Sequence, residues 1–202
     1  MSDASQNRFN MLNLYPDTFF RRLLFRAPLW LWRLGLGPLI GDLFLMLTST
    51  GRKSGLPRHA ALEYHYLRGT IYVVSAFGER SAWHKNILAD PRVTVQTARA
   101  TQSMRAVHVI DDAELLEVYE VFKRRDAPLT NWYMRSLDIQ DNPDDILAKK
   151  DRIHLLRFDP IREATPPPLE ADLVWVWPVA LIAMLIVFVL MRVSNRDAGK
   201  HG

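Results

Sequence analysis

A basic turn flanked by glycines is the first stretch of this sequence whose residue types could do chemistry. Residues 51–58 read GRKSGLPR. Arg52, Lys53 and Arg58 surround backbone N–H groups that the turn exposes from Gly51 onward, and such a turn between two strands can hold a phosphate or a carboxylate. It is not a P-loop, because the GxxxxGK[ST] order is absent and no helix follows. Charge and glycine content alone leave open whether the turn binds an anion or is a solvated basic turn.

A second candidate stretch, AFGERSAWHKN over 76–86, follows an apolar strand and enters a helix. Gly78 permits a close approach of the backbone to a ligand, and the helix start offers free N–H groups. Trp83 is placed to stack against a ring and Asn86 to orient it. The alternative is that Trp83 belongs to the core and Asn86 to the surface.

Several reaction classes have no counterpart in the sequence. It contains no cysteine, which excludes disulfides, Cys-ligated zinc, CxxC redox pairs and Cys nucleophiles. Its six histidines show no HExxH or other metal-ligand spacing, and no GxSxG elbow occurs. We therefore expect no metal and assign no catalytic acid or base. The net charge of +4 fits an anionic ligand or lipid surface, and no nucleic-acid motif accompanies it.

Short strands with helical inserts are expected to position these residues within a domain over 43–162. The expected strands cover 43–50, 59–67, 70–76, 92–97, 103–110 and 152–158, and the expected helices cover 81–89, 111–125 and a short segment from 142. Asp111 is expected to cap its helix. Strands 59–67 and 70–76 should form one hairpin, and 92–97 and 103–110 another. This order predicts a closed antiparallel barrel rather than a βαβ sheet.

The C-terminal region predicts a membrane anchor. LVWVWPVALIAMLIVFVLM over 173–191 has no charged residue and would reach about 28 Å as a helix, close to the hydrocarbon thickness of a bilayer. We expect a transmembrane helix over 173–192, a stiff Pro-rich linker over 163–172 that separates it from the domain, and a polar tail over 193–202. The alternative is a buried core helix.

The N-terminal segment, 1–42, also suits a membrane interface. Apolar residues recur at helical spacing over 19–34 beside several arginines, and such a helix can lie among lipid headgroups or cover one end of the barrel. Basic residues follow the C-terminal apolar run, so the positive-inside rule would place the C-terminus in the cytoplasm. A long folded domain weakens that rule, and we expect the domain itself to be cytoplasmic.

The motifs together resemble the deazaflavin-dependent nitroreductase family. The resemblance rests on LMLTSTGRKSGLPR over 45–58, VVSAFG over 73–78 and SAWHKNILADPRVTVQ over 81–96. It covers about 43–109, and RIHLLRFDP fits the family's closing strand. It implies an α+β, mainly β fold, a split β-barrel of the FMN-binding and flavin-reductase type.

The resemblance also implies reduced coenzyme F-420, a deazaflavin, as hydride donor to a quinone or nitroaromatic. Its acidic tail would meet Arg52, Lys53 and Arg58 beside Gly51. Its ring would lie near Ala76, Phe77, Gly78, Trp83 and Asn86. Trp132 and Tyr133 fall where relatives shape a substrate pocket.

The sequence departs from the family pattern around the ring pocket. Phe77-Gly78-Glu79 replaces a Lys-Gly-Gly type turn, and Ser81-Ala82-Trp83-His84 lacks the usual Pro and Tyr. FMN is therefore an alternative cofactor, and a non-catalytic barrel that binds lipid, flavin or haem is an alternative function. We expect a membrane-anchored oxidoreductase whose partners are a lipophilic substrate and the bilayer. The oligomeric state stays open, a homodimer included.

Overall fold

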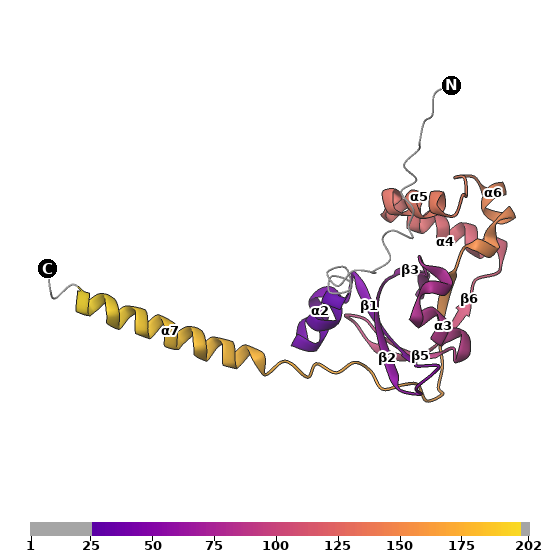
Figure 1. Cartoon of the computed structure of the whole chain (residues 1–202). Coiled ribbons are helices and arrows are strands. Elements are labelled where there is room, and N and C mark those ends of the chain that lie inside the picture. The colour runs from indigo at the N-terminus through magenta and orange to yellow at the C-terminus, as the bar shows by residue number, and fades with distance from the viewer. Residues whose placement is uncertain (1–25, 199–202) are drawn as a thin grey trace, which may run out of the picture.

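An antiparallel sheet of seven strands forms the body of the protein in the computed structural model, which describes residues 26–198 (Figure 1). The strands are β1 (Phe44–Thr50), β2 (Pro57–Glu63), β3 (His65–Leu67), β4 (Thr70–Val74), β5 (Arg92–Gln96), β6 (Thr101–His108) and β7 (Leu155–Pro160). They lie in the order β2-β1-β5-β6-β7-β4-β3. The hairpins predicted from the sequence are present as β3–β4 and β5–β6.

The sheet curls because its two edge strands are neighbours in the sequence. Only Tyr64 separates β2 from β3, yet these strands lie at opposite edges. Tyr64 is buried, and its hydroxyl donates a hydrogen bond of 2.7 Å to the carbonyl oxygen of Gly41. The single strand predicted over 59–67 is therefore broken at this corner. The closed barrel predicted from the sequence is wrong in that hydrogen bonding stops at two edges, which makes the sheet a split barrel.

Two hydrophobic cores lie on the two faces of the curled sheet. The inner core gathers alternate residues of five strands, among them Leu45, Leu47, Val95 and Phe158, with Ile87 of α3 (Ala82–Ala89). The outer core lies between the sheet and the helices α4 (Asp112–Arg125), α5 (Ala127–Ser136) and α6 (Pro143–Ala148). Because successive side chains of a strand point to opposite faces of the sheet, the strands contribute residues to both cores. The short turns η3 (Gly78–Arg80) and η4 (Lys150–Arg152) complete the body.

The helix caps follow the sequence closely. The Asp111 carboxylate accepts from the Glu114 backbone N–H at 2.8 Å, as predicted, and Asn142 accepts from Asp145 N–H at 2.8 Å. The sequence analysis missed α5. Its start carries a recognisable signal, since the Asp126 side chain caps Leu129 N–H at 3.0 Å and a proline occupies the first turn.

The Pro-rich segment over 163–172, which the sequence predicts to be a stiff linker between the domain and the C-terminal helix, packs along the sheet. Thr165 hydrogen-bonds Thr94 and Ser103 through hydroxyl contacts of 2.7 and 2.9 Å. Gln96 pairs with the backbone of Leu169 in both directions, at 2.8 and 3.1 Å. These contacts hold the chain on the outside of β5 and β6 until it reaches Asp172.

The end of this segment is clamped to the N-terminal helical region, which contains η2 (Trp32–Leu36) and α2 (Gly37–Ile40). Arg33 makes a two-pronged ion pair with Asp172, at 2.7 and 2.5 Å. The Leu173 N–H donates to the Arg33 carbonyl oxygen at 2.9 Å, and the Trp177 indole N–H donates to the Leu34 carbonyl oxygen at 2.8 Å. The two segments predicted to meet a membrane therefore contact each other. Residues 1–25 of the N-terminal segment lie outside the described residues.

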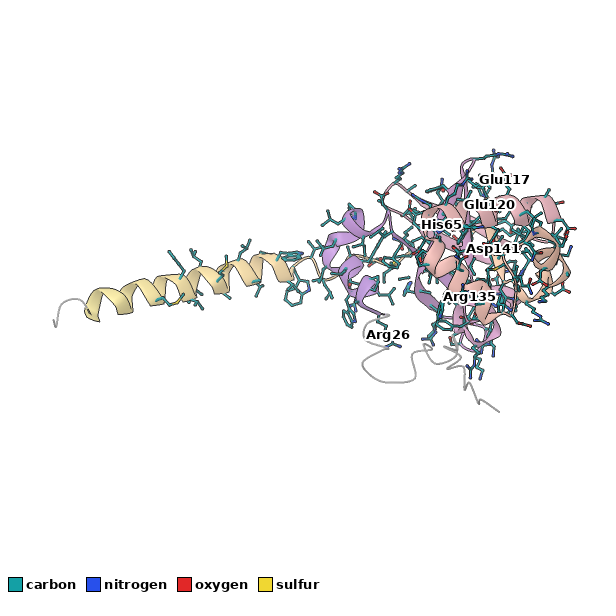
Figure 2. All side chains as sticks on the ribbon, turned by 90° about the horizontal axis from the view of Figure 1, so that it is seen from above. Arg26, His65, Glu117, Glu120, Arg135 and Asp141 are labelled. Carbon is teal, nitrogen blue, oxygen red and sulfur yellow. The ribbon has the colours of Figure 1, made fainter. Side chains whose placement is uncertain are left out.

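The C-terminal helix α7 (Val176–Ala198) projects away from the body (Figures 1 and 2). Residues 173–175 form turns against η2, so the helix starts at Val176 and not at Leu173. Among the helices that the structure describes, none is long and apolar enough to cross a bilayer, contrary to the transmembrane helix predicted over 173–192.

One buried imidazole makes the stability of this fold depend on pH. His65 is 6% exposed, packs edge-on against Phe122 and lies 3.4 Å from the Arg125 guanidinium. Burial, reinforced by Arg125, lowers the pKa of His65 to about 4. The unfolded chain, with a histidine pKa of about 6.5, therefore binds the proton more tightly than the folded protein does.

We expect this difference to lower the free energy of unfolding by up to about 3 kcal/mol as the pH falls from about 6.5 to about 4. Urea unfolding of the protein and of His65→Gln, measured across this range, checks it. The variant should lose less stability on acidification than the parent. Equal losses would show that His65 does not titrate in this window.

Candidate functional site

The basic turn between β1 and β2 is tightly hydrogen-bonded and presents its cations to solvent. Gly51 N–H donates to the Leu56 carbonyl oxygen at 2.9 Å, and Gly55 N–H donates to the Gly51 carbonyl oxygen at 2.7 Å. Gly55 has a φ of 67°, a left-handed conformation that favours glycine. Arg52, Lys53 and Arg58 are all exposed. Within the described part of the chain, no carboxylate lies at ion-pair distance from any of the three.

Asn86 fixes the turn to helix α3. Its side chain is 4% exposed, so the surface alternative for this residue is wrong. The Asn86 amide oxygen accepts from the Arg52 backbone N–H at 3.3 Å and from the Arg52 guanidinium at 3.1 Å, while its amide nitrogen donates to the Ser49 hydroxyl at 3.4 Å. A helix thus positions a basic loop through one buried amide. Whether Asn86 also orients a bound ring stays a prediction.

The segment from Ala76 to Trp83 closes the same end of the barrel. Gly78 N–H donates to the Ser75 carbonyl oxygen at 2.9 Å, and Gly78 has a φ of 48°. A Cβ atom at Gly78 would lie 2.6 Å from the His154 ring. Ala76 and Phe77 pack against the outer core, and Trp83 packs against the inner one. The core alternative for Trp83 therefore holds in part, because the indole is half-buried.

Three histidines meet beside Gly78, and their spacing in the sequence does not predict this contact. His84 is 1% exposed, and its Nε2 lies 3.3 Å from Nε2 of the half-buried His108. The His84 and His154 rings are 5.0 Å apart between centroids. The three residues come from α3, the end of β6 and the position just before β7, so only tertiary structure brings them together. We define them as the histidine cluster.

The histidine cluster has the chemistry of a proton donor or acceptor. Burial, reinforced by His154, lowers the pKa of His108 below its usual range. An Nε2–Nε2 contact between neutral rings requires one ring to donate and the other to accept. Among the described residues, no group of three potential ligands has the geometry to hold a metal ion.

Strand register places all of these parts at one end of the barrel. Thr50 pairs with Pro57 at the basic turn, and Ser49 pairs with Val93 on the neighbouring strand. The other strands reach the same end where Val74 pairs with Leu155 and His108 pairs with Leu156. We call this the α3 end. The predicted cofactor residues therefore converge, although they span 51–86 in the sequence.

Trp132 and Tyr133 lie on α5, behind this end. Tyr133 is 7% exposed and belongs to the outer core, and Trp132 packs against the same core. Burial raises the pKa of Tyr133, and the adjacent His154 backbone opposes part of that effect. The structure thus gives Tyr133 a packing role close to the histidine cluster. A role for either residue in a substrate pocket stays a prediction.

Comparison with protein families gives a match over residues 35–138, a little more than half of the 202 residues, to the F420H(2)-dependent quinone reductase family. The chain belongs to the F420H2-dependent quinone reductase family. It is therefore an oxidoreductase with coenzyme F-420 as its cofactor, which favours F-420 over the FMN alternative. The matched range contains the basic turn, α3 and the β5–β6 hairpin.

Several solved structures are similar to this chain at low identity. A structure titled F420-H2 dependent reductase is 18% identical, with 58% of this chain and 93% of that chain covered and a TM-score of 0.43. The heme storage protein HutZ from Vibrio cholerae is 15% identical over 69% of this chain and 95% of its own, with a TM-score of 0.44. A conserved hypothetical protein from Mycobacterium tuberculosis is 19% identical, with 61% of this chain and 79% of that chain covered and a TM-score of 0.38. The family assignment rests on the family match and not on these overlaps.

The residues at the α3 end fit an acidic coenzyme. Three exposed cations surround the turn with no carboxylate of the described residues at ion-pair distance, and their side chains suit phosphate and carboxylate groups. The backbone N–H groups of Gly51, Arg52, Ser54, Gly55 and Leu56 already donate hydrogen bonds within the protein, so an anion would be held by the side chains. Gly78 keeps the backbone free of a Cβ beside the histidine cluster.

The contact between Gly78 and His154 can be tested by adding one methyl group. We expect Gly78→Ala to displace the His154 ring and lower the free energy of unfolding by about 2–3 kcal/mol, through positive φ and steric overlap together. Gly69→Ala is the matched control, because Gly69 also has a positive φ, of 82°, but faces open space. Urea unfolding and histidine NMR shifts are the measurements. Equal destabilisation by both variants, without a shift at His154, would contradict the contact.

Proposed function

We propose that this protein transfers a hydride from reduced F-420 to a lipophilic acceptor such as a quinone or a nitroaromatic. The single observation that carries the proposal is the basic turn, where three exposed cations have no acidic partner among the described residues, on a loop that buried Asn86 holds in place. Bound F-420 would supply the hydride. The chain's own residues bind and orient the coenzyme, and hydride transfer needs positioning above all.

In this proposal Arg52, Lys53 and Arg58 hold the phosphate and the acidic tail of the coenzyme. A guanidinium offers several N–H donors in a plane and pairs well with such oxyanions. The Arg52 guanidinium is already oriented by Asn86, and Arg58 contacts the Ser54 hydroxyl at 3.3 Å. Little side-chain freedom therefore remains to be lost when these two residues bind an anion.

The ring would lie along 76–78 and Trp83. Its proposed neighbours combine a glycine backbone, a half-buried indole and, behind Gly78, the histidine cluster. This surface is mostly apolar, which suits a flat ring and keeps water away from it. The family match, which covers all of these residues except His154, supports this arrangement.

Neutralising the turn tests the cofactor site. We expect Arg52→Gln/Lys53→Gln/Arg58→Gln to weaken F-420 binding roughly hundredfold or more, because a charge-assisted hydrogen bond contributes about 1.5–3 kcal/mol. Fluorescence titration of F-420 measures the affinity, and a parallel titration with FMN checks selectivity.

The control for this experiment is Arg68→Gln/Arg135→Gln/Arg162→Gln, which removes the same charge from exposed positions outside the site. It should bind F-420 as the parent does. If both triple variants bound F-420 with the parent's affinity, the basic turn would not be the cofactor site.

We further propose that α7 associates with lipid, which would bring the enzyme to a lipophilic acceptor. Its side chains are exposed on every side, since the consecutive residues 184–188 are each 51–65% exposed (Figure 2). Exposed apolar side chains are unfavourable in water, and association with lipid would bury them. The clamp between Arg33 and Asp172 would keep the domain next to the membrane surface. The cytoplasmic placement of the domain stays a prediction.

The test introduces charge into α7. Leu181 and Leu185 are 60% and 62% exposed, and replacing each with glutamate should cost on the order of 3 kcal/mol per residue in an apolar environment. We expect Leu181→Glu/Leu185→Glu to abolish flotation with phosphatidylcholine vesicles and to leave F-420 affinity unchanged. Ile110→Glu, at a position 78% exposed on the body, is the control and should float normally. Undiminished flotation of the α7 variant would refute lipid association through this helix.

A further inference from the structure

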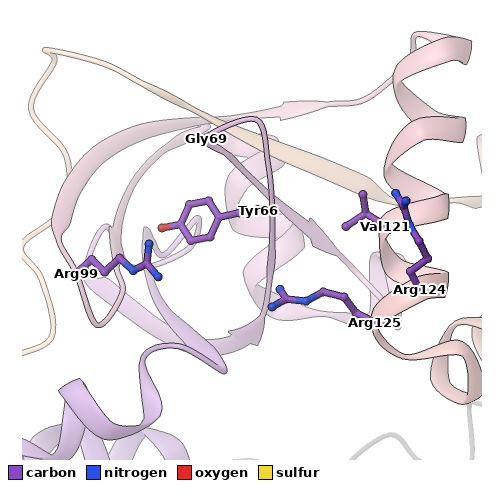
Figure 3. A pocket seen from close by; sticks show the side chains of 6 residues that line it. All are labelled: Tyr66, Gly69, Arg99, Val121, Arg124 and Arg125. Carbon is purple, nitrogen blue, oxygen red and sulfur yellow. The ribbon is translucent and has the colours of Figure 1, made fainter.

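A second basic site lies on the body, away from the cofactor turn. A cavity of about 680 Å³ is lined by Tyr66, Gly69, Arg99, Val121, Arg124 and Arg125. Figure 3 shows the Tyr66 ring between the guanidinium of Arg99 on one side and that of Arg125 on the other. The lining comes from β3, the β3–β4 turn, the β5–β6 turn and the last turn of α4. We call it the arginine pocket.

The three arginines keep most of their hydrogen-bonding capacity free for a ligand. Arg124 donates to the Glu120 carbonyl oxygen at 3.2 Å, and Arg125 approaches the His65 ring at 3.4 Å. No carboxylate of the described residues lies at ion-pair distance from Arg99, Arg124 or Arg125. A guanidinium has five N–H donors, so the pocket has a large surplus of donors over acceptors.

Acidic groups near the pocket offset part of its charge. Burial and the negative charge of Asp126 raise the pKa of Glu63, and the positive charge of Arg125 opposes this rise. The negative charge of Asp42 raises the pKa of Tyr64, and the positive charge of Arg99 lowers it. None of these carboxylates lines the cavity or forms a described ion pair with Arg99, Arg124 or Arg125.

Strand register separates the arginine pocket from the cofactor turn. Met46 pairs with Gln96, and the β5–β6 turn that carries Arg99 follows directly. The basic turn follows Thr50, at the other end of β1. The seven residues of β1 span roughly 20 Å at about 3.3 Å per residue. The arginine pocket is therefore a separate site at the opposite end of the barrel.

The end that contains the arginine pocket also carries exposed apolar residues and the base of α7, although Leu56 and Leu88 are exposed at the α3 end. Ala98, next to Arg99, donates its N–H to the Gly41 carbonyl oxygen at 3.2 Å, which joins the β5–β6 turn to the end of α2. Leu39 and Leu43, on either side of Gly41, are 75% and 65% exposed. The start of α7 docks on η2 at the same end. Cationic and apolar groups thus lie together, as they do on surfaces that meet lipid headgroups.

We propose that the arginine pocket binds the phosphate of an anionic lipid headgroup. This rests on the proposed lipid association of α7 and adds a specific headgroup site to it. Guanidinium groups bind phosphate oxygens in pairs, and the Tyr66 hydroxyl adds a donor between them. Lipid is favoured over a free phosphate because exposed leucines and the apolar helix border the same end of the barrel. The site would set the height and tilt of the barrel over the membrane.

Vesicle binding of the full-length protein tests the proposal, with phosphatidylcholine vesicles compared to vesicles that also contain phosphatidylglycerol. We expect tighter binding to the anionic vesicles. Arg99→Gln/Arg125→Gln should reduce that preference on the order of tenfold, since each basic residue at an anionic surface contributes about 1 kcal/mol. Binding to neutral vesicles should be unchanged in this variant.

The matched control is Arg135→Gln/Arg162→Gln, which removes the same charge from exposed positions that do not line the cavity. It should keep the preference for anionic vesicles. An equal loss in both double variants would overturn the pocket and leave general electrostatic attraction.

Two further outcomes separate the linked proposals. If the parent binds neutral vesicles but shows no anionic preference, the headgroup site is overturned while lipid association through α7 stands. If inorganic phosphate shifts the Arg99 and Arg125 side-chain NMR signals saturably and no vesicle preference exists, the ligand is a soluble anion and the lipid assignment is overturned.

Discussion

The corner at Tyr64 is the constraint on which the rest of the structure depends. One residue connects β2 to β3, and these strands are the two edges of the same sheet. A connection of one residue can join the two edges of the sheet only if the sheet curls. The hydrogen bond from the Tyr64 hydroxyl to the Gly41 carbonyl oxygen holds that corner against the end of α2. Curling gives the sheet an inside, which the alternating Leu, Val and Phe side chains fill.

A curled sheet has two ends, and the protein uses them differently. At the α3 end, buried Asn86 holds the basic turn while Gly78 lies against the histidine cluster. At the other end, α2, the start of α7 and the arginine pocket lie together. The acidic coenzyme and the lipid surface would therefore be approached from opposite ends of one inner core. A single small domain can then hold a water-soluble donor while it stays close to a membrane.

The Pro-rich segment connects these ends along the outside of the barrel. Its hydrogen bonds to Gln96 and Thr94 make it part of the sheet surface, and its last residue before the turn into α7 is the partner of Arg33. The direction in which α7 leaves the body is consequently set by the folded domain. A flexible spacer would leave α7 free to point in many directions, whereas this clamp fixes its first residues against η2; in the proposed association with lipid, it would restrict the tilt of the barrel.

The sequence by itself determined the strands, most helices and the basic turn, because each depends on local patterns. A run of β-branched and aromatic residues marks β4, Asp111 marks the start of α4, and Gly51 and Gly55 mark the turn. Helix α5 was missed although Asp126 and Pro128 signal its start. Only the tertiary structure decided the split at Tyr64, the docking of 163–172, the histidine cluster and the arginine pocket. Each of these joins residues from distant segments, and no local pattern encodes which end of a curled sheet a side chain will reach.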